Sequence, residues 1–167
     1  GFGLVRAEGG LAGTPLALGE SARIGAREPV TLISDGGGGN KEITGACVVS
    51  RRTFAGYWEY LLDEAIFTTP PHDNWAGAAL VGRDGRLGGI GSLMVSNAAD
   101  DDHALPGNMF VPIDALAGVL DDLLHYGRPR RPQRPWLGMF VAENLGRLIV
   151  SHLAPEGPAE ATGIAVG

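Results

Sequence analysis

The segment HDNWAGAALV at residues 72–81 determines how the rest of this chain is interpreted. It is a polar stretch that follows two prolines and leads into an apolar Ala-Leu-Val run. The turn GRDG at residues 82–85 comes next, and a second apolar run, LGGIGSLMV, occupies residues 87–95. An Asp-Gly turn between two apolar runs predicts a β-hairpin, and small residues in a strand indicate close approach of backbones. We therefore expect a site of close backbone approach, presented by the loop that enters this hairpin.

The same segment resembles trypsin-like serine proteases of the HtrA/DegP type, which read GNSGGALV, then a short Asp-Gly turn, then a Val-Gly-Ile-Asn-type strand. In this resemblance Ala76 takes the position of the nucleophilic serine, and alanine has no oxygen that could attack a carbonyl. The family's oxyanion hole uses the backbone amides that correspond to Asn74 and Ala76. Asn reaches the left-handed conformation of glycine more readily than most residues, so the resemblance implies a distorted oxyanion hole.

Other parts of the chain resemble the same family in order and spacing. The segment LALGES at residues 16–21 resembles a block that follows the triad aspartate, which places Gly1 at the aspartate position. Glycine cannot orient a histidine, and the family's histidine would lie upstream of residue 1. Gly91, Ser92 and Leu93 fall where the family's strand edge binds substrate backbone as an added strand. The loop before Ala76 is longer than in the family, which alters the expected specificity pocket.

Composition agrees with a globular β-protein. Of the 167 residues, 44% are hydrophobic and 19% are charged, which is enough apolar material for a real core. The 27 glycines and 11 prolines follow no collagen-like period, so they indicate many turns between short strands. A net charge of -6 predicts no general attraction for nucleic acid or anionic lipid. No apolar run approaches the roughly 18 residues of a membrane helix, and no signal peptide opens the chain.

The C-terminal part divides into a helix, a linker and a second unit. Apolar residues recur at helical spacing between residues 113 and 126, which predicts one helix that packs on the barrel. The run RPRRPQRP at residues 128–135 is basic enough to suggest nucleic acid, but its prolines favour a semi-rigid linker. Residues 136–167 resemble the start of a PDZ domain, in which Leu137, Gly138 and Met139 would receive a peptide's C-terminal carboxylate. We expect the chain to be a fragment that begins inside one barrel and ends inside this domain.

Several residues invite other kinds of chemistry. His72 and Asp73 could form an acid-base pair, but adjacent residues point apart, so we expect solvated loop residues. The acidic stretch at residues 100–102 with His103 lacks the spacing of a calcium or zinc site, so we expect a solvated loop, no metal and no cofactor. The glycine run at residues 36–39 lacks the ending of a phosphate loop and predicts a hairpin turn. Cys47 is the only cysteine, and its apolar neighbours predict a small buried hydrophobe.

The sequence therefore predicts a mainly β fold: a trypsin-like antiparallel β-barrel with a C-terminal helix at residues 1–127, a linker at 128–135, and a partial PDZ domain at 136–167. The predicted barrel strands are residues 30–33, 43–49, 57–67, 78–81, 87–95 and 109–111.

Two functional hypotheses remain open. The chain is a pseudoprotease that holds unfolded polypeptides or peptide C-termini without cutting them, or an active endopeptidase whose serine was replaced by Ala76 through mutation or sequencing error. Gly1 favours the first hypothesis, because a deliberate inactivation would change one member of the triad and here two positions depart. The resemblance also implies a periplasmic or cell-envelope location and a homo-oligomer, which is a trimer in the family.

Overall fold

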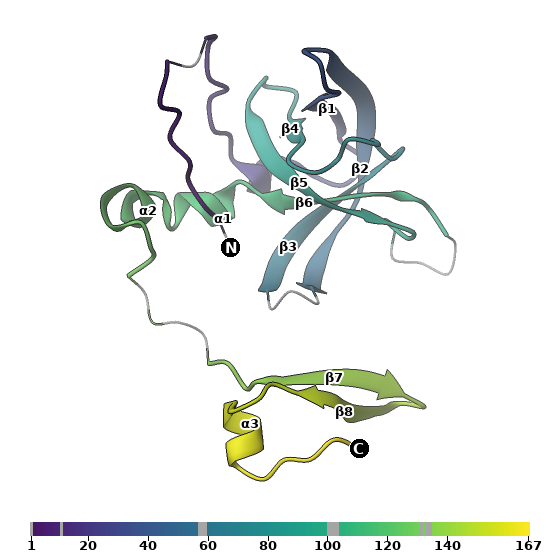
Figure 1. Ribbon diagram of the computed structural model, residues 1–167. Helices are drawn as coiled ribbons and strands as arrows, with labels where there is room; N and C mark the ends of the chain where they lie inside the picture. The colour runs from purple at the N-terminus through teal and green to yellow at the C-terminus, as the bar shows by residue number, and fades with distance from the viewer. Residues whose placement is uncertain (1, 11, 57–59, 100–103, 131, 133–134) are drawn as a thin grey trace. The chain divides into compact units, whose positions relative to one another are not determined.

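The computed structural model describes residues 2–10, 12–56, 60–99, 104–130, 132 and 135–167 (Figure 1). The chain divides into two compact units, residues 1–129 and 130–167, and the division falls inside the arginine- and proline-rich segment. Each unit is described separately below. No helix in the described ranges is long and apolar enough to cross a membrane.

The first unit contains a closed barrel in which every neighbouring pair of strands is antiparallel. The strand order around the barrel is β1-β2-β3-β6-β5-β4, and β4 pairs back onto β1. The predicted antiparallel barrel is therefore confirmed. Tyr57, where the sequence predicted the third strand to begin, lies outside the described residues. The six strands are β1 Pro29–Asp35, β2 Lys41–Gly56, β3 Tyr60–Thr69, β4 Ala79–Val81, β5 Leu87–Val95 and β6 Gly107–Pro112.

Alternating side chains fill the barrel. In β1, Val30 and Leu32 are buried while the intervening Thr31 is only half-buried, which is the period of a strand with one face on a core. Residues of β2, β3, β4 and β6, together with Ile24 and Ala78 outside the strands, meet them in one cluster: Ile24, Val30, Leu32, Ala46, Val48, Ile66, Ala78, Leu80 and Phe110.

Strand β3 is buried on both of its faces. Ile66 belongs to the barrel cluster, whereas Phe67 packs with Ala65, Ala98 and Met109 in a second cluster outside it. Phe54 of β2 contributes to this second cluster through an edge-on ring contact with Phe67. The double coverage explains why Ala65, Ile66 and Phe67 form a continuous apolar run and do not alternate with polar residues.

The predicted helical segment at residues 113–126 is present, but it is divided into two helices and is not the single helix that was predicted. Helix α1 spans Asp114–Ala117 and α2 spans Leu120–Tyr126. Gly118, a poor helix former, follows α1, and the β-branched Val119 has φ −134°, outside the helical region. Both helices still use the predicted apolar face, because Ile113, Leu116 and Leu123 pack together.

A carboxylate on α1 holds the segment that precedes the barrel. Asp114 accepts hydrogen bonds from the backbone amides of Ser21 (2.9 Å) and Ala22 (2.8 Å) at the start of the short 3-10 helix Ser21–Arg23. The Ser21 hydroxyl in turn accepts a hydrogen bond from the Asp114 amide. Burial raises the pKa of Asp114, but these hydrogen bonds and the Arg51 charge outweigh it and lower the pKa below its ordinary value.

The second unit is a β-hairpin with one short helix. Strand β7, Met139–Asn144, pairs antiparallel with β8, Arg147–Leu153, and α3 spans Pro158–Ala161. The two hairpin-turn residues, Leu145 and Gly146, both have positive φ, which matches the twist of a two-residue hairpin turn. Most apolar side chains of this unit stay exposed, as is usual for an isolated two-stranded hairpin.

We predict that Asp114→Ala lowers the free energy of unfolding by about 1–2 kcal/mol at pH 7, because two backbone amides lose their acceptor. Since the folded pKa is lowered, this contribution is present above the ordinary Asp pKa of about 3.9 and is lost as pH falls through the folded pKa. Denaturant unfolding of both proteins at neutral and acidic pH measures it. Asp63→Ala, which removes an exposed carboxylate, serves as the control. An equal loss at both pH values would contradict the capping role.

Candidate functional site

The segment predicted to present a site connects β3 to β4. It begins after the cis Thr69-Pro70 bond and ends in a turn from Trp75 to Ala78, closed by a 3.0 Å hydrogen bond from the Ala78 amide to the Trp75 carbonyl. Gly77 occupies the third position of this turn with φ +77°, the conformation that a type II turn requires there. Ala76 therefore lies exposed at the tip of the turn.

The turn is docked on Gly91 of β5. The Gly77 amide donates to the Gly91 carbonyl (2.9 Å), and the Gly91 amide donates to the Ala78 carbonyl (2.8 Å). A Cβ atom on Gly91 would lie 2.0 Å from the Trp75 carbonyl oxygen, so no other residue fits without moving the turn. The backbone amide and carbonyl of Gly91 are therefore both bonded within the chain, to Ala78 and Gly77.

Ser92 and Leu93, the other two residues predicted to bind substrate, follow directly along β5. The pairing of β5 with β6 shifts register between Gly91 and Leu93, so Ser92 lies at an irregularity of this ladder. Irregularities of this kind re-aim side chains at the ends of sheets. The structure keeps both residues beside the docked turn.

His72 is the largest departure from the sequence-based expectation. The sequence predicted a solvated loop residue, but only 1% of His72 is exposed. Its Nε2 lies 2.8 Å from the Ser34 hydroxyl and its Nδ1 lies 2.8 Å from the Thr44 hydroxyl, so both ring nitrogens have partners. These contacts offset the cost of burying the ring. Asp73 is exposed, so the two neighbours do point apart, as predicted.

Asn108 of β6 holds the backbone of His72 and was not anticipated. Its Oδ1 accepts from the His72 amide (2.7 Å), and its Nδ2 donates to the His72 carbonyl (3.2 Å). Asn108 is fully buried, so these two bonds satisfy its polar atoms where water cannot. The sequence held no signal for Asn108. It did hold one for the partners of His72, because Ser34 and Thr44 are polar residues at positions of β1 and β2 where the strand period predicts core-facing side chains.

Asn74 does not behave as the resemblance implied. Its φ is not in the left-handed region, which among the described non-glycine residues is occupied by Arg27, Leu145 and Glu156. Its side-chain amide instead donates to Glu42 of β2. In the described part of the chain, the backbone amides of Asn74 and Ala76 meet no hydrogen-bond acceptor. The two predicted oxyanion-hole donors are therefore not occupied by internal contacts.

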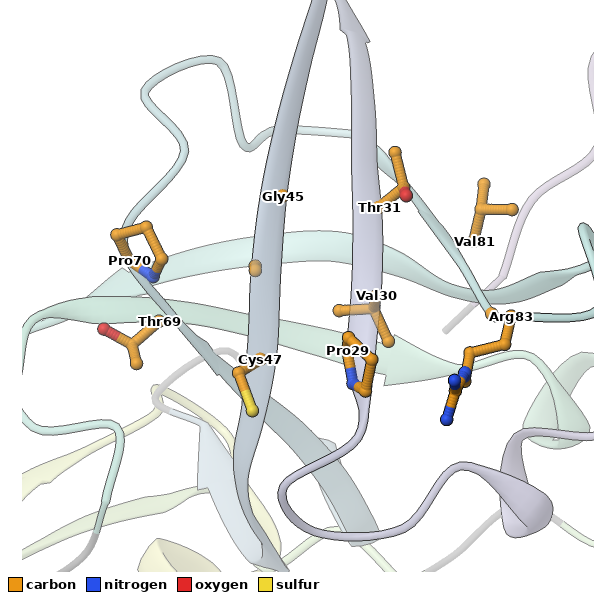
Figure 2. A pocket seen from close by; sticks show the side chains of 11 residues that line it. Pro29, Val30, Thr31, Gly45, Cys47, Thr69, Pro70, Val81 and Arg83 are labelled. Carbon is orange, nitrogen blue, oxygen red and sulfur yellow. The ribbon is translucent and has the colours of Figure 1, made fainter.

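A groove of about 580 Å³ lies over β1, β2 and the end of β4, away from Ala76 (Figure 2). Cys47 lines it and is half-buried, so the predicted buried cysteine is wrong. The pairing of β2 explains the difference: Ala46 and Val48 face the core, which turns Cys47 to the outer face. The groove is lined by Pro29, Val30, Thr31, Gly45, Ala46, Cys47, Thr69, Pro70, Val81, Gly82 and Arg83.

The remaining predicted residues lie elsewhere. Gly1 and residues 100–103 lie outside the described residues. Leu137, Gly138 and Met139 lie at the start of β7 in the second unit, where the Leu137 and Gly138 carbonyls accept from the amides of Ala159 and Ala154.

No family model matches the sequence, and no curated protein matches it. Solved structures do match. The HtrA-type protease AlgW with a decapeptide is 19% identical, with a TM-score of 0.57, over 90% of this chain and 48% of that chain. AlgW with a tripeptide is 21% identical, with a TM-score of 0.54, over 91% of this chain and 52% of that chain. A serine endoprotease from Yersinia pestis is 20% identical, with a TM-score of 0.54, over 91% and 48% of the two chains. The chain thus spans about half the length of these structures and has the fold of HtrA-type proteases.

We predict that Gly91→Ala lowers the free energy of unfolding by about 3 kcal/mol or displaces the turn at residues 75–78, because the added methyl group meets backbone atoms. Denaturant unfolding and hydrogen exchange at the Gly77 amide measure both effects. Gly45→Ala is the matched control, because a Cβ on Gly45, also in a barrel strand, meets nothing within 4 Å. Equal effects of the two substitutions would contradict the docking argument.

Proposed function

Because the chain has the fold of HtrA-type proteases, we propose that it is the second barrel of a serine endopeptidase homologue that has lost its nucleophile and binds polypeptides without cleaving them. The observation that carries this proposal is the position of Ala76 at the exposed tip of the turn docked on Gly91. Acyl transfer needs a nucleophile at such a tip, with a base and backbone donors around it. Ala76 supplies a backbone donor and no nucleophile.

Peptide binding is supported by what remains at the turn. The amides of Asn74 and Ala76 have no acceptor among the described residues and are available to a ligand carbonyl oxygen. Two of the similar structures carry a decapeptide and a tripeptide. Ser92 and Leu93 would pair with an extended segment beside the turn.

The second unit would contribute a second peptide site. We infer that residues 136–167 are the start of a PDZ domain and that the loop of Leu137, Gly138 and Met139 receives a C-terminal carboxylate. The carbonyls of Leu137 and Gly138 are bonded to the segment around α3, which fixes this loop. By the same family resemblance we place the protein in the periplasm or cell envelope, as a homo-oligomer.

The alternative is an active endopeptidase in which Ala76 replaces serine. One observation favours it: the positive φ of Gly77 and the closed Trp75–Ala78 turn would present a serine side chain as well as an alanine. The two proposals differ in what restoring the hydroxyl does.

We predict that Ala76→Ser, made in the longest polypeptide that contains this chain, recovers little hydrolysis of fluorescein-labelled unfolded casein. A serine without an oriented base stays unreactive, since loss of the orienting carboxylate alone costs on the order of 10⁴ in turnover. The unsubstituted protein should bind the casein, as measured by fluorescence anisotropy, and release no fragments. The double variant Ala76→Ser with Gly1→Asp tests the second position. Robust turnover by Ala76→Ser alone would establish the alternative.

A further inference from the structure

We propose that Ser34 is a reactive serine, activated by His72, that is modified by small activated acyl or phosphonyl donors. This site does not use Ala76, so it goes beyond the proposed peptide-binding function. The site lies at the polar end of the barrel interior, where Ser34 and Thr44 contact His72. It includes no residue of the turn at residues 75–78.

The pair has the geometry of a nucleophile and its base. The Ser34 hydroxyl lies 2.8 Å from Nε2 of His72, within the distance at which a base can take a hydroxyl proton. The His72 side chain is fully buried, whereas Ser34 is half-buried. The residue that carries the hydroxyl is thus partly open to a small reagent, whereas the ring that serves as the base is covered.

The surrounding charges select the tautomer that activates Ser34. Neutral histidine carries one N–H donor and one acceptor nitrogen. A Glu42 carboxylate oxygen lies 3.9 Å from Nδ1, and a negative charge there favours the proton on Nδ1. We therefore assign the Nδ1 proton to the bond with the Thr44 hydroxyl, 2.8 Å away. The Nε2 lone pair then faces Ser34, whose hydroxyl donates to it.

Each member of the array is fixed by a further contact. Asn108 bonds both the amide and the carbonyl of His72, so the ring cannot move with its loop. The side chain of Asn74 holds the second oxygen of Glu42. Ser34 pairs directly with Glu42 across β1 and β2, which keeps the carboxylate on the histidine side of the serine. Because these groups are already held in position, less entropy is lost when they reach the reactive geometry.

The chemistry is a single displacement. With a small alkyl fluorophosphonate, the Ser34 oxygen forms a bond to phosphorus, the P–F bond breaks, and fluoride leaves with the bonding electrons. The Ser34 proton passes to Nε2 and stays on the imidazolium, which the Glu42 carboxylate stabilises. An activated ester reacts in the same way at its acyl carbon.

The test treats the 167-residue chain with a small alkyl fluorophosphonate and maps the adduct by mass spectrometry of peptides. We expect one phosphonyl group on Ser34 and none in Ser34→Ala. Ser50→Ala is the matched control, because Ser50 is also half-buried but its hydroxyl donates to the Ala98 carbonyl. Its labelling should equal that of the unsubstituted chain.

A second variant separates chemistry from folding. Glu42→Gln keeps an oxygen that can accept from Asn74 but removes the charge that favours the reactive tautomer, so we expect the labelling rate to fall about tenfold with little change in stability. No adduct, an adduct on another residue, or an unchanged rate in Glu42→Gln would overturn the proposal. Any of these results would leave the peptide-binding proposal intact, because that proposal depends on Ala76 and its variants.

Discussion

The pairing of β4 with β1 is the contact that closes the barrel. It joins only three residue pairs, from Ala79 opposite Ile33 to Val81 opposite Thr31. Leu80, at the middle of β4, is fully buried and contributes to the main core. So short a strand forms few hydrogen bonds of its own. Its position therefore depends on the loop before it, which connects β3 to β4. The contacts of His72 with Asn108 and of the Trp75–Ala78 turn with Gly91 supply that restraint at the two ends of the loop.

The same loop explains why the two proposed sites lie so close together in sequence. Its first part enters the barrel, where His72 meets hydroxyl groups on β1 and β2. Its last part turns outward and exposes Ala76. A chain that alternates between core and surface within five residues can lose reactivity at the tip without disturbing the polar contacts inside. In the proposed function, an alanine at position 76 would therefore carry no structural penalty.

The strands and their membership in one antiparallel barrel could be predicted from the sequence, because runs of apolar residues and Asp-Gly turns are local signals and the blocks resemble a known family. The burial of His72 could not, because its partners are 28 and 38 residues away and a polar residue after two prolines is typical of surface loops. Cys47 was misplaced for a related reason: its neighbours are apolar, but only the register of β2 decides which of them faces inward. The break at Gly118 and Val119 was missed because the helical period of the apolar residues continues through it, from Leu116 to Leu123. The sequence predicted that another stretch of backbone comes close to this hairpin. It did not reveal that, at Gly91, this backbone is the turn at residues 75–78 of the same chain.

The contact between Asp114 and Ser21 joins residues 93 positions apart. Closing so long a stretch of chain costs entropy that short-range strand pairing does not, and contacts of this separation slow folding. The barrel hairpins can form from neighbouring segments, whereas this link needs β6 and α1 in position first. We infer that residues 17–24 and the two helices form the last part of the first unit to assemble. Their opening in the native protein would not leave the barrel unchanged, because Ile24 belongs to the barrel core and Ala17 and Gly19 are hydrogen-bonded to Leu87 of β5.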